Sequence, residues 1–314
     1  MPYVALPPLA REARLAVART RWEAILAVRP DLAPALALQR SLLEPVIDLT
    51  DTLLTGRLPR LSLPPRYLAA KLDKRVPALA AEPIPLPVAT LRPTLLQLCR
   101  NLASGGAGDA ALQIHAAIDA GTLDAGAVLG AALSRDQKAI TVGSLHRRLQ
   151  SELVWLVAEL AVSPFVYGLQ QIIVGQLNGG RSGESLASAL DRWQQGYCPI
   201  CGSWPALIET VEGRRMVRCS FCALAWTLTE PGCVYCGDVG PGFVTQAPDP
   251  RRPDRRLETC GRCRSYVKAV DVDELSPFPL LAIGDMETMD LDVMVMKQGF
   301  QRPALKAFST AKAV

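Results

Sequence analysis

Eight of the nine cysteines in this chain occur as four Cys-x-x-Cys pairs within one stretch of 66 residues. The pairs are Cys198/Cys201, Cys219/Cys222, Cys233/Cys236 and Cys260/Cys263. Two thiolates separated by two residues can bind one metal ion from a tight turn, and two such pairs complete a tetrahedral shell. The four pairs therefore predict two metal ions, each held by four cysteines.

The spacing between the pairs favours a sequential arrangement, in which the first two pairs bind one ion and the last two bind the other. Seventeen residues separate Cys201 from Cys219, which falls in the range of about 15–20 that is typical of zinc ribbons. Twenty-three residues separate Cys236 from Cys260. An interleaved arrangement, first pair with third and second with fourth, stays open. So does a redox disulfide within one pair, although it would leave half a shell unused.

The ligand set indicates what kind of metal site to expect. Both histidines, His115 and His146, lie far upstream of the cysteines. We therefore expect all-thiolate shells without a position for water, as in structural or electron-carrying sites. The segment Cys198-Pro-Ile-Cys-Gly202 has the form of a rubredoxin-type knuckle, which also occurs in zinc ribbons. Sulfur-rich tetrahedral sites accept either ion, so iron and zinc both stay open.

The bulk composition describes a folded protein. The chain has 314 residues, of which 49% are hydrophobic and 20% charged, and this length allows two to three domains. The net charge of +4 does not require a polyanionic partner. The first residues lack the pattern of a signal peptide, and paired cysteines suit a reducing compartment, so we expect a cytoplasmic protein.

The elements that must position the cysteines follow from the spacing of apolar residues. Helices are predicted over about 9–28, 31–53, 90–102, 109–120, 124–133, 137–149, 152–177, 184–195 and 283–298. Prolines predict an extended connection over 59–65 and a polyproline strap over 82–88. Short β-type runs are expected at 206–211, 216–219 and 226–229. Residues 160–180 carry no charge, but Pro164 and several polar residues interrupt them, which favours a buried core helix over a membrane span.

These patterns predict an α+β protein in three parts. Residues 1–195 form a mainly helical domain, and residues 196–272 form a small β-rich domain that is nucleated by the metal knuckles. Residues 273–314 form a helix and a tail that pack on the rest. Cys99 falls in a helical apolar pattern and is expected to be an inert buried thiol.

Neither the catalytic motifs nor the basic residues of the sequence point to an enzyme or to nucleic acid. Phosphate-binding, dinucleotide-binding and nucleophile-elbow motifs are missing from the sequence, so no enzyme activity and no small-molecule substrate are predicted. Basic residues cluster in a loop at Arg251, Arg252, Arg255 and Arg256. Such residues can bind a phosphate backbone, but residues 198–271 carry ten basic and eight acidic side chains, a net +2 that disfavours nucleic acid.

The cysteine-rich third resembles the FdhE family, the accessory proteins for formate dehydrogenase formation. The resemblance rests on four segments of this sequence together with the later Lys297-Gln-Gly-Phe300. The four segments are Cys198-Pro-Ile-Cys-Gly-Ser-Trp-Pro205, Cys219-Ser-Phe-Cys-Ala-Leu-Ala-Trp226, Cys233-Val-Tyr-Cys-Gly237 and Cys260-Gly-Arg-Cys-Arg-Ser-Tyr-Val-Lys268. The resemblance implies tandem rubredoxin-like knuckles that use all eight cysteines. It also implies a role in bringing formate dehydrogenase to its active form by contact with the catalytic subunit.

The sequence thus leaves one leading function and two alternatives. In the leading one, the knuckle domain and residues 277–300 contact the partner protein, through Trp226, Tyr266, Lys268 and the four arginines. The first alternative is a zinc-ribbon protein that binds nucleic acid through Arg251, Arg252, Arg255 and Arg256. The second is a rubredoxin-like electron-transfer protein, which requires iron.

Overall fold

The computed structural model describes residues 3–56, 58 and 63–304. These residues divide into two compact units, each assembled from several segments of the chain. One unit contains residues 9–56, 58 and 81–169, and the other contains residues 3–8, 63–80 and 170–304. The predicted boundaries at 195/196 and 272/273 stay a prediction. The units themselves interleave in sequence, since residues 63–80 belong with the cysteine-rich part.

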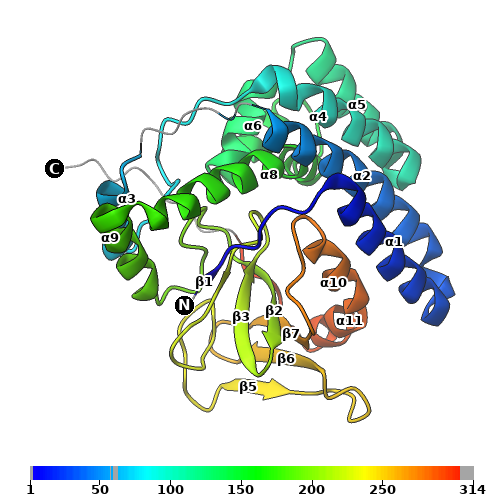
Figure 1. Cartoon of the computed structure of the whole chain (residues 1–314). Helices are drawn as coiled ribbons and strands as arrows, with labels where there is room; N and C mark the ends of the chain where they lie inside the picture. Colours follow the sequence, from blue (N-terminus) through cyan, green and yellow to red (C-terminus); the bar gives the residue numbers. More distant parts are fainter. Residues whose placement is uncertain (1–2, 57, 59–62, 305–314) are drawn as a thin grey trace. The chain divides into compact units, whose positions relative to one another are not determined.

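The first unit is helical (Figure 1). Its helices are α1 (Arg11–Val28), α2 (Ala33–Thr55), α4 (Val88–Leu102), α5 (Gly108–Asp119), α6 (Ala125–Leu133), α7 (Gln137–Leu145) and the first part of α8 (Ser151–Gly175). Apolar residues at helical spacing decide which face is buried: in α1, Leu15, Trp22 and Ile25 are buried. The predicted helices of this region are therefore present, with ends that differ by a few residues.

Side-chain caps and glycines separate these helices. Asp124 accepts a hydrogen bond from the backbone N–H of Ala127 at the start of α6, and Asp136 caps α7 in the same way. Between α4 and α5, Gly106 has a φ of +120°, a conformation that side chains disfavour.

Cys99, on α4, is fully buried, and burial raises the pKa of its thiol to about 12, as expected for an inert thiol.

Among the described residues, α8 is the one helix that is long and apolar enough to cross a membrane by length and composition. In its most apolar window, 72% of the residues are buried inside the protein. The core helix of a soluble protein meets the same criterion. The choice of a core helix for residues 160–180 stays a prediction.

The second unit is built on a seven-stranded sheet with the order β1-β4-β3-β2-β7-β6-β5. The strands are β1 (Tyr3–Val4), β2 (Pro205–Val211), β3 (Arg214–Cys219), β4 (Ala225–Trp226), β5 (Phe243–Gln246), β6 (Arg255–Cys260) and β7 (Ser265–Asp271). Neighbouring strands are antiparallel except β2 and β7, which run parallel in the middle of the sheet. Two residues near the start of the chain, strands between the cysteines and a strand after the last of them therefore share one sheet.

Four helices complete this unit. They are α3 (Pro65–Asp73), α9 (Gly180–Asp191), α10 (Leu281–Glu287) and α11 (Met289–Lys297). Helix α3 packs on α9, while α10 contacts β2 and α11 contacts β7. The predicted single helix over 283–298 is interrupted at Thr288, whose hydroxyl donates to the carbonyl of Gly284. The fold class, α+β with tandem four-cysteine knuckles, is confirmed.

Two local predictions were wrong. Pro65 does not continue an extended connection but occupies the first position of α3, where proline's fixed φ suits a helix start and its missing N–H is not needed. The β-run at 226–229 ends at Trp226, because β4 has only two residues that pair with β3 and β1. Residues 82–87 have no regular secondary structure, and the predicted connection over 59–65 lies partly outside the described residues.

Candidate metal centres

The eight paired cysteines meet in two groups of four, in the sequential arrangement that the spacing favoured. We call Cys198, Cys201, Cys219 and Cys222 centre 1, and Cys233, Cys236, Cys260 and Cys263 centre 2. Within each centre, the four sulfur atoms all lie within 4.8 Å of one another. The free sulfurs form no disulfide. Each centre can therefore offer four thiolates to one ion.

The sulfur separations fit a tetrahedral metal shell. In centre 1 the Sγ atoms of Cys201 and Cys219 are 3.4 Å apart, and those of Cys198 and Cys222 are 3.6 Å apart. In centre 2 the corresponding cross-pair distances are 3.6 Å. A tetrahedron with metal–sulfur bonds of about 2.3 Å has edges of about 3.8 Å. The donor set and its spacing thus suit zinc or iron, and nothing in the geometry distinguishes the two.

All four Cys-x-x-Cys turns, which we number knuckles 1 to 4 in chain order, share one backbone conformation. The residue directly after each pair has a left-handed φ of +57° to +79°; these residues are Gly202, Ala223, Gly237 and Arg264. In knuckles 1, 3 and 4 its N–H donates to the carbonyl of the first cysteine, at 2.8–2.9 Å. This turn brings the two sulfurs of a pair to the same side of the backbone. Glycine favours it, but Ala223 and Arg264 adopt it despite their side chains.

Backbone N–H groups of the turn also face sulfur, as expected for a rubredoxin-type knuckle. In knuckle 2 the N–H groups of Phe221 and Cys222 donate to the Sγ of Cys219, at 3.3 and 3.4 Å. Such hydrogen bonds stabilise negative charge on the sulfur. The thiolate form that binds metal is therefore supported by the peptide backbone itself.

In centre 1, burial disfavours the charged form in which cysteines bind metal. All four of its cysteines are buried. Burial raises the pKa values of Cys198 and Cys222 well above normal. Burial also acts to raise the pKa of Cys201, but hydrogen bonds from the neighbouring cysteines outweigh it and lower that pKa. Four buried thiolates repel one another unless a metal ion compensates their charge.

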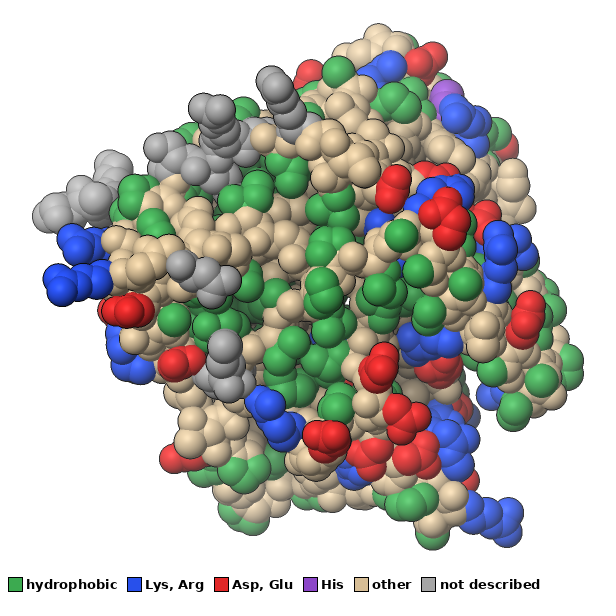
Figure 2. Space-filling model, in the orientation of Figure 1, with side chains coloured by type: hydrophobic (Ala, Val, Ile, Leu, Met, Phe, Trp, Pro, Cys, Tyr) green, Lys and Arg blue, Asp and Glu red, His purple; other side chains and the backbone are tan. Residues whose placement is uncertain are grey.

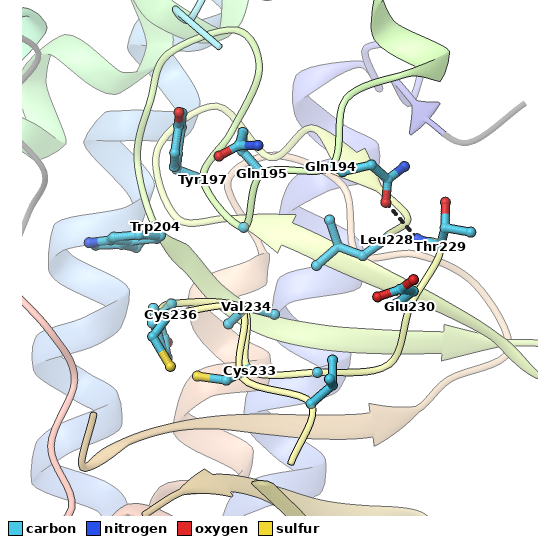
Figure 3. A pocket seen from close by; sticks show the side chains of 15 residues that line it. Gln194, Gln195, Tyr197, Trp204, Leu228, Thr229, Glu230, Cys233, Val234 and Cys236 are labelled. Carbon is cyan, nitrogen blue, oxygen red and sulfur yellow. Dashed lines mark hydrogen bonds between the residues drawn. The ribbon is translucent and has the colours of Figure 1, made fainter. Parts of the chain in front are cut away.

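Centre 2 differs from centre 1 because one side of it faces solvent. Cys233 and Cys260 are buried, Cys263 is half-buried and Cys236 is exposed. Next to centre 2, a cavity of about 530 Å³ is lined by residues 194–197, 228–230, 232–237 and 239 together with Trp204. Figure 3 shows Cys233, Val234 and Cys236 along one side of this cavity and Tyr197 and Gln195 along the opposite side. Centre 2 is thus the metal site that another molecule can approach.

Three of the predicted partner-binding residues are buried in this chain, which corrects that prediction. Trp226 is 2% exposed, and its indole N–H donates to the carbonyl of Gln195. Tyr266 donates its hydroxyl proton to Asp292, at 2.6 Å. The Lys268 ammonium is fully buried between Asp285 and Asp292, at 2.8 and 2.5 Å. These three side chains hold the unit together and do not present a surface to a partner.

The four arginines lie at the surface, but ion pairs engage three of them. Arg252 pairs with Asp254, and Arg256 with Asp271. Arg255 pairs with Asp290 of α11; Arg251 is exposed. On the face drawn in Figure 2, acidic and basic side chains of the coloured residues lie among one another. No observation therefore favours the nucleic-acid alternative.

Three aromatic side chains close to the cysteines contact one another and were not predicted as site residues. Trp204, three residues after Cys201, contacts Tyr197 and Tyr235 edge to face, with ring centroids 5.8 and 5.3 Å apart. Tyr235 stands between the ligands Cys233 and Cys236. The closeness of Trp204 and Tyr235 to ligands in the sequence could have pointed to them. Nothing in the sequence placed the two rings against each other.

The fold and the two four-cysteine groups define a metal-binding protein with tandem knuckles in one sheet. No family model matches the chain. A protein FdhE homolog of Aquifex aeolicus is 33% identical over 118 residues, which cover 35% of this chain and 40% of that protein. A protein FdhE homolog of Haemophilus influenzae is 31% identical over 116 residues, covering 36% and 38%. One from Citrobacter koseri is 25% identical over 150 residues, covering 46% and 47%.

The similarity to a solved structure extends further than the sequence similarity. The crystal structure of the FdhE protein from Pseudomonas aeruginosa matches with a TM-score of 0.56 and covers 98% of both chains, at 20% identity. At this identity the match shows a common fold. Each sequence match spans less than half of the relative's length. The resemblance to the FdhE family, which the cysteine motifs predicted, is confirmed.

Proposed function

We propose that this protein is an accessory factor that is needed for active formate dehydrogenase, and that it acts by binding the catalytic subunit of that enzyme in the cytoplasm. The resemblance to the FdhE family supports this role. The thiolate chemistry supports the compartment, since both centres need reduced cysteines to hold metal. Shells of four thiolates leave no position open for a substrate, which supports a binding role over a catalytic one.

The observation that carries the proposal is the open side of centre 2 and the apolar surface on α11. Val293, Met294 and Met296 are exposed on this helix. Arg264, the residue after Cys263, donates to the carbonyl of Gln298 at 2.6 Å, so the end of α11 lies at knuckle 4. Methionine side chains are flexible and polarisable and adapt to a partner's surface. We assign the partner contact to this surface, within the predicted region 277–300.

The test uses the native host with this gene deleted. Formate-dependent dye reduction and immunoblots of the dehydrogenase subunits are measured after complementation with wild type or with the Met294→Glu/Met296→Glu variant. We expect wild type to restore activity. The variant should fail to do so while subunit levels persist, and it should no longer co-purify with the catalytic subunit.

A matched control separates surface charge from partner contact. Val142→Glu/Leu145→Glu introduces the same two charges at side chains that are 48% and 74% exposed on α7, in the other unit, and should behave as wild type. Full activity in the deletion strain without any complementation would refute the role. Normal co-purification of the double variant would refute the assigned surface alone.

A second candidate function, electron transfer, is favoured by the aromatic contacts described above. Trp204, three residues after a ligand of centre 1, contacts Tyr235, which adjoins a ligand of centre 2, and centre 2 is open to a redox partner. This function requires iron. A purified protein that binds iron, absorbs visible light and titrates reversibly supports it, and a protein that binds only zinc in the cell excludes it.

A further inference from the structure

The segment that follows α11, residues 298–304, is attached to two of the metal knuckles. We call it the latch segment. It turns at Gly299, where φ is +80°, and then pairs with the start of β7, since the N–H of Gln301 donates to the carbonyl of Arg264 at 3.0 Å. At its far end, the carbonyl of Ala304 accepts a hydrogen bond from the Trp204 indole at 2.9 Å. The latch segment thus connects knuckle 4 with the residues that follow knuckle 1.

Arg264 makes most of the contact at knuckle 4. Its guanidinium donates to the carbonyl of Gln298 at 2.6 Å and lies over the ring of Phe300, 4.2 Å from the centroid. Phe300 packs against a small buried cluster of Leu257, Tyr266, Leu291 and Val295. One residue therefore holds the latch segment through its carbonyl, its charge and its stacking.

Two further ion pairs fix the middle of the latch segment. Arg302 pairs with Asp285 at 2.5 Å and with Asp292 at 3.1 Å. The same two carboxylates neutralise the buried Lys268 of β7. The latch segment, α10, α11 and β7 thus share one charge network, which extends from the sheet to the surface.

The conformation of Arg264 depends on the knuckle to which it belongs. Its left-handed φ of +57° is unusual for a side chain of this size, and its N–H closes the turn onto the carbonyl of Cys260 at 2.8 Å. In centre 2 the sulfurs of Cys233 and Cys263 are 3.6 Å apart. Without a metal ion nothing draws the four sulfurs to one point, so the turn opens and frees Arg264 to return to an ordinary backbone conformation. Its carbonyl and guanidinium then no longer face residues 298–301.

We propose that the latch segment is held by metal in centre 2 and released when that centre is empty. The contacts at Arg264 make the position of the C-terminal residues 298–304 a readout of whether centre 2 is loaded. Because coupling between two sites is reciprocal, the attached latch segment also strengthens metal binding at centre 2. The inference concerns this chain alone and does not depend on the partner proposed above.

The reciprocal effect gives the sharper experiment. In purified, metal-loaded protein, the metal affinity in competition with a chromophoric chelator is compared for wild type, Phe300→Ala and the control Leu145→Ala, whose side chain is 74% exposed. Neither position is a ligand. We expect Phe300→Ala to weaken metal binding at centre 2 at least about fivefold, with centre 1 and the control unchanged. Equal affinity of Phe300→Ala and wild type at centre 2 would overturn the proposal.

Hydrogen exchange tests whether the latch segment is released when centre 2 cannot hold metal. Comparison with amides of β3 separates this release from general unfolding of the variant. The amides of Phe300 and Gln301 donate within the fold, to Val295 and Arg264. In the Cys236→Ser protein, which lacks the exposed ligand of centre 2, we expect these amides to exchange at least about tenfold faster. Amides of β3 next to centre 1 should stay protected. Unchanged protection at 300–301, or a loss that appears only together with that of β3, would contradict a latch.

Discussion

A buried ion pair next to centre 1 yields a stability prediction whose size follows from the structure. Arg218 and Glu209 are 0% and 1% exposed, and they form an ion pair between β3 and β2. Arg218 also donates to the carbonyls of Ala223, in knuckle 2, and Ser276, at 3.1 and 2.6 Å. The N–H of Ser276 donates to Glu209 at 3.0 Å. The pair therefore ties the sheet to knuckle 2 and to the segment before α10.

Replacing one partner leaves the other buried and charged. Removing a single partner of such a pair costs about 3–5 kcal/mol, so we expect Arg218→Met to lower the free energy of unfolding by that amount. The double variant Arg218→Met/Glu209→Gln has no buried charge and keeps an acceptor for Ser276. Unsatisfied neutral groups in the double variant cost about 1–3 kcal/mol. Its free energy of unfolding should therefore be about 2 kcal/mol higher than that of Arg218→Met.

The assay is urea unfolding of the metal-loaded protein, followed by far-UV circular dichroism. Arg252→Met is the matched control, because it removes an arginine whose pair with Asp254 is exposed and whose expected effect is below about 1 kcal/mol. If Arg218→Met costs no more than Arg252→Met, the burial argument is wrong. If the double variant is no more stable than the single one, the penalty does not come from the unpaired charge of Glu209.

Three further predictions concern the metal centres and the charge network. A chelator should remove the two metals in two phases, first from centre 2, because Cys236 is exposed whereas all ligands of centre 1 are buried; release of both in one phase would contradict this. Ala223→Gly should raise the free energy of unfolding by ~0.5 kcal/mol in urea titrations, because the left-handed φ of +57° strains alanine more than glycine loses in entropy; a clear loss would contradict it. Burial acts to raise the pKa of Asp285, but Arg302 and Lys268 outweigh it and lower that pKa. Its contribution to stability is therefore complete above the unfolded value of about 3.9 and is lost as pH falls through the folded value. The stability difference between wild type and Asp285→Asn should thus shrink below about pH 4, and a constant difference would disprove this cause.

The sequence was most informative where chemistry is local. The pairing Cys-x-x-Cys fixes two ligands in one turn, and spacings of 17 and 23 residues selected the sequential grouping that the structure has. The helices of the first unit were also predictable, because α1, α2 and α4 to α7 bury one face at helical spacing and α8 is apolar over most of its length. Both successes depend on residues that are close together in the chain.

The features that were not predicted depend on residues that are far apart in the chain. Lys268 reads locally as a surface lysine, and only Asp285 and Asp292, 17 and 24 residues later, make its burial tolerable. Tyr266 and Trp226 likewise find their hydrogen-bond acceptors 26 and 31 residues away. Strands β5 to β7 escaped prediction because their polar and apolar residues alternate weakly, and β7 pairs with β2, a strand that is distant in the chain. Long-range compensation of this kind cannot be recognised from one sequence.

The order of knuckles and strands is repeated in the two halves of the sheet. Each centre belongs to the same series of a knuckle, two strands, a second knuckle and a third strand, over residues 198–226 and again over 233–271. In both series the first strand begins opposite the first cysteine of the second knuckle, with Pro205 against Cys219 and Phe243 against Cys260. The two copies follow each other head to tail in one sheet, which is why β2 and β7 meet in parallel. Two series joined in this way have no symmetry axis between them, so each has different neighbours in the sheet. The ligands of centre 1 are therefore free to be buried while Cys236 of centre 2 stays within reach of solvent.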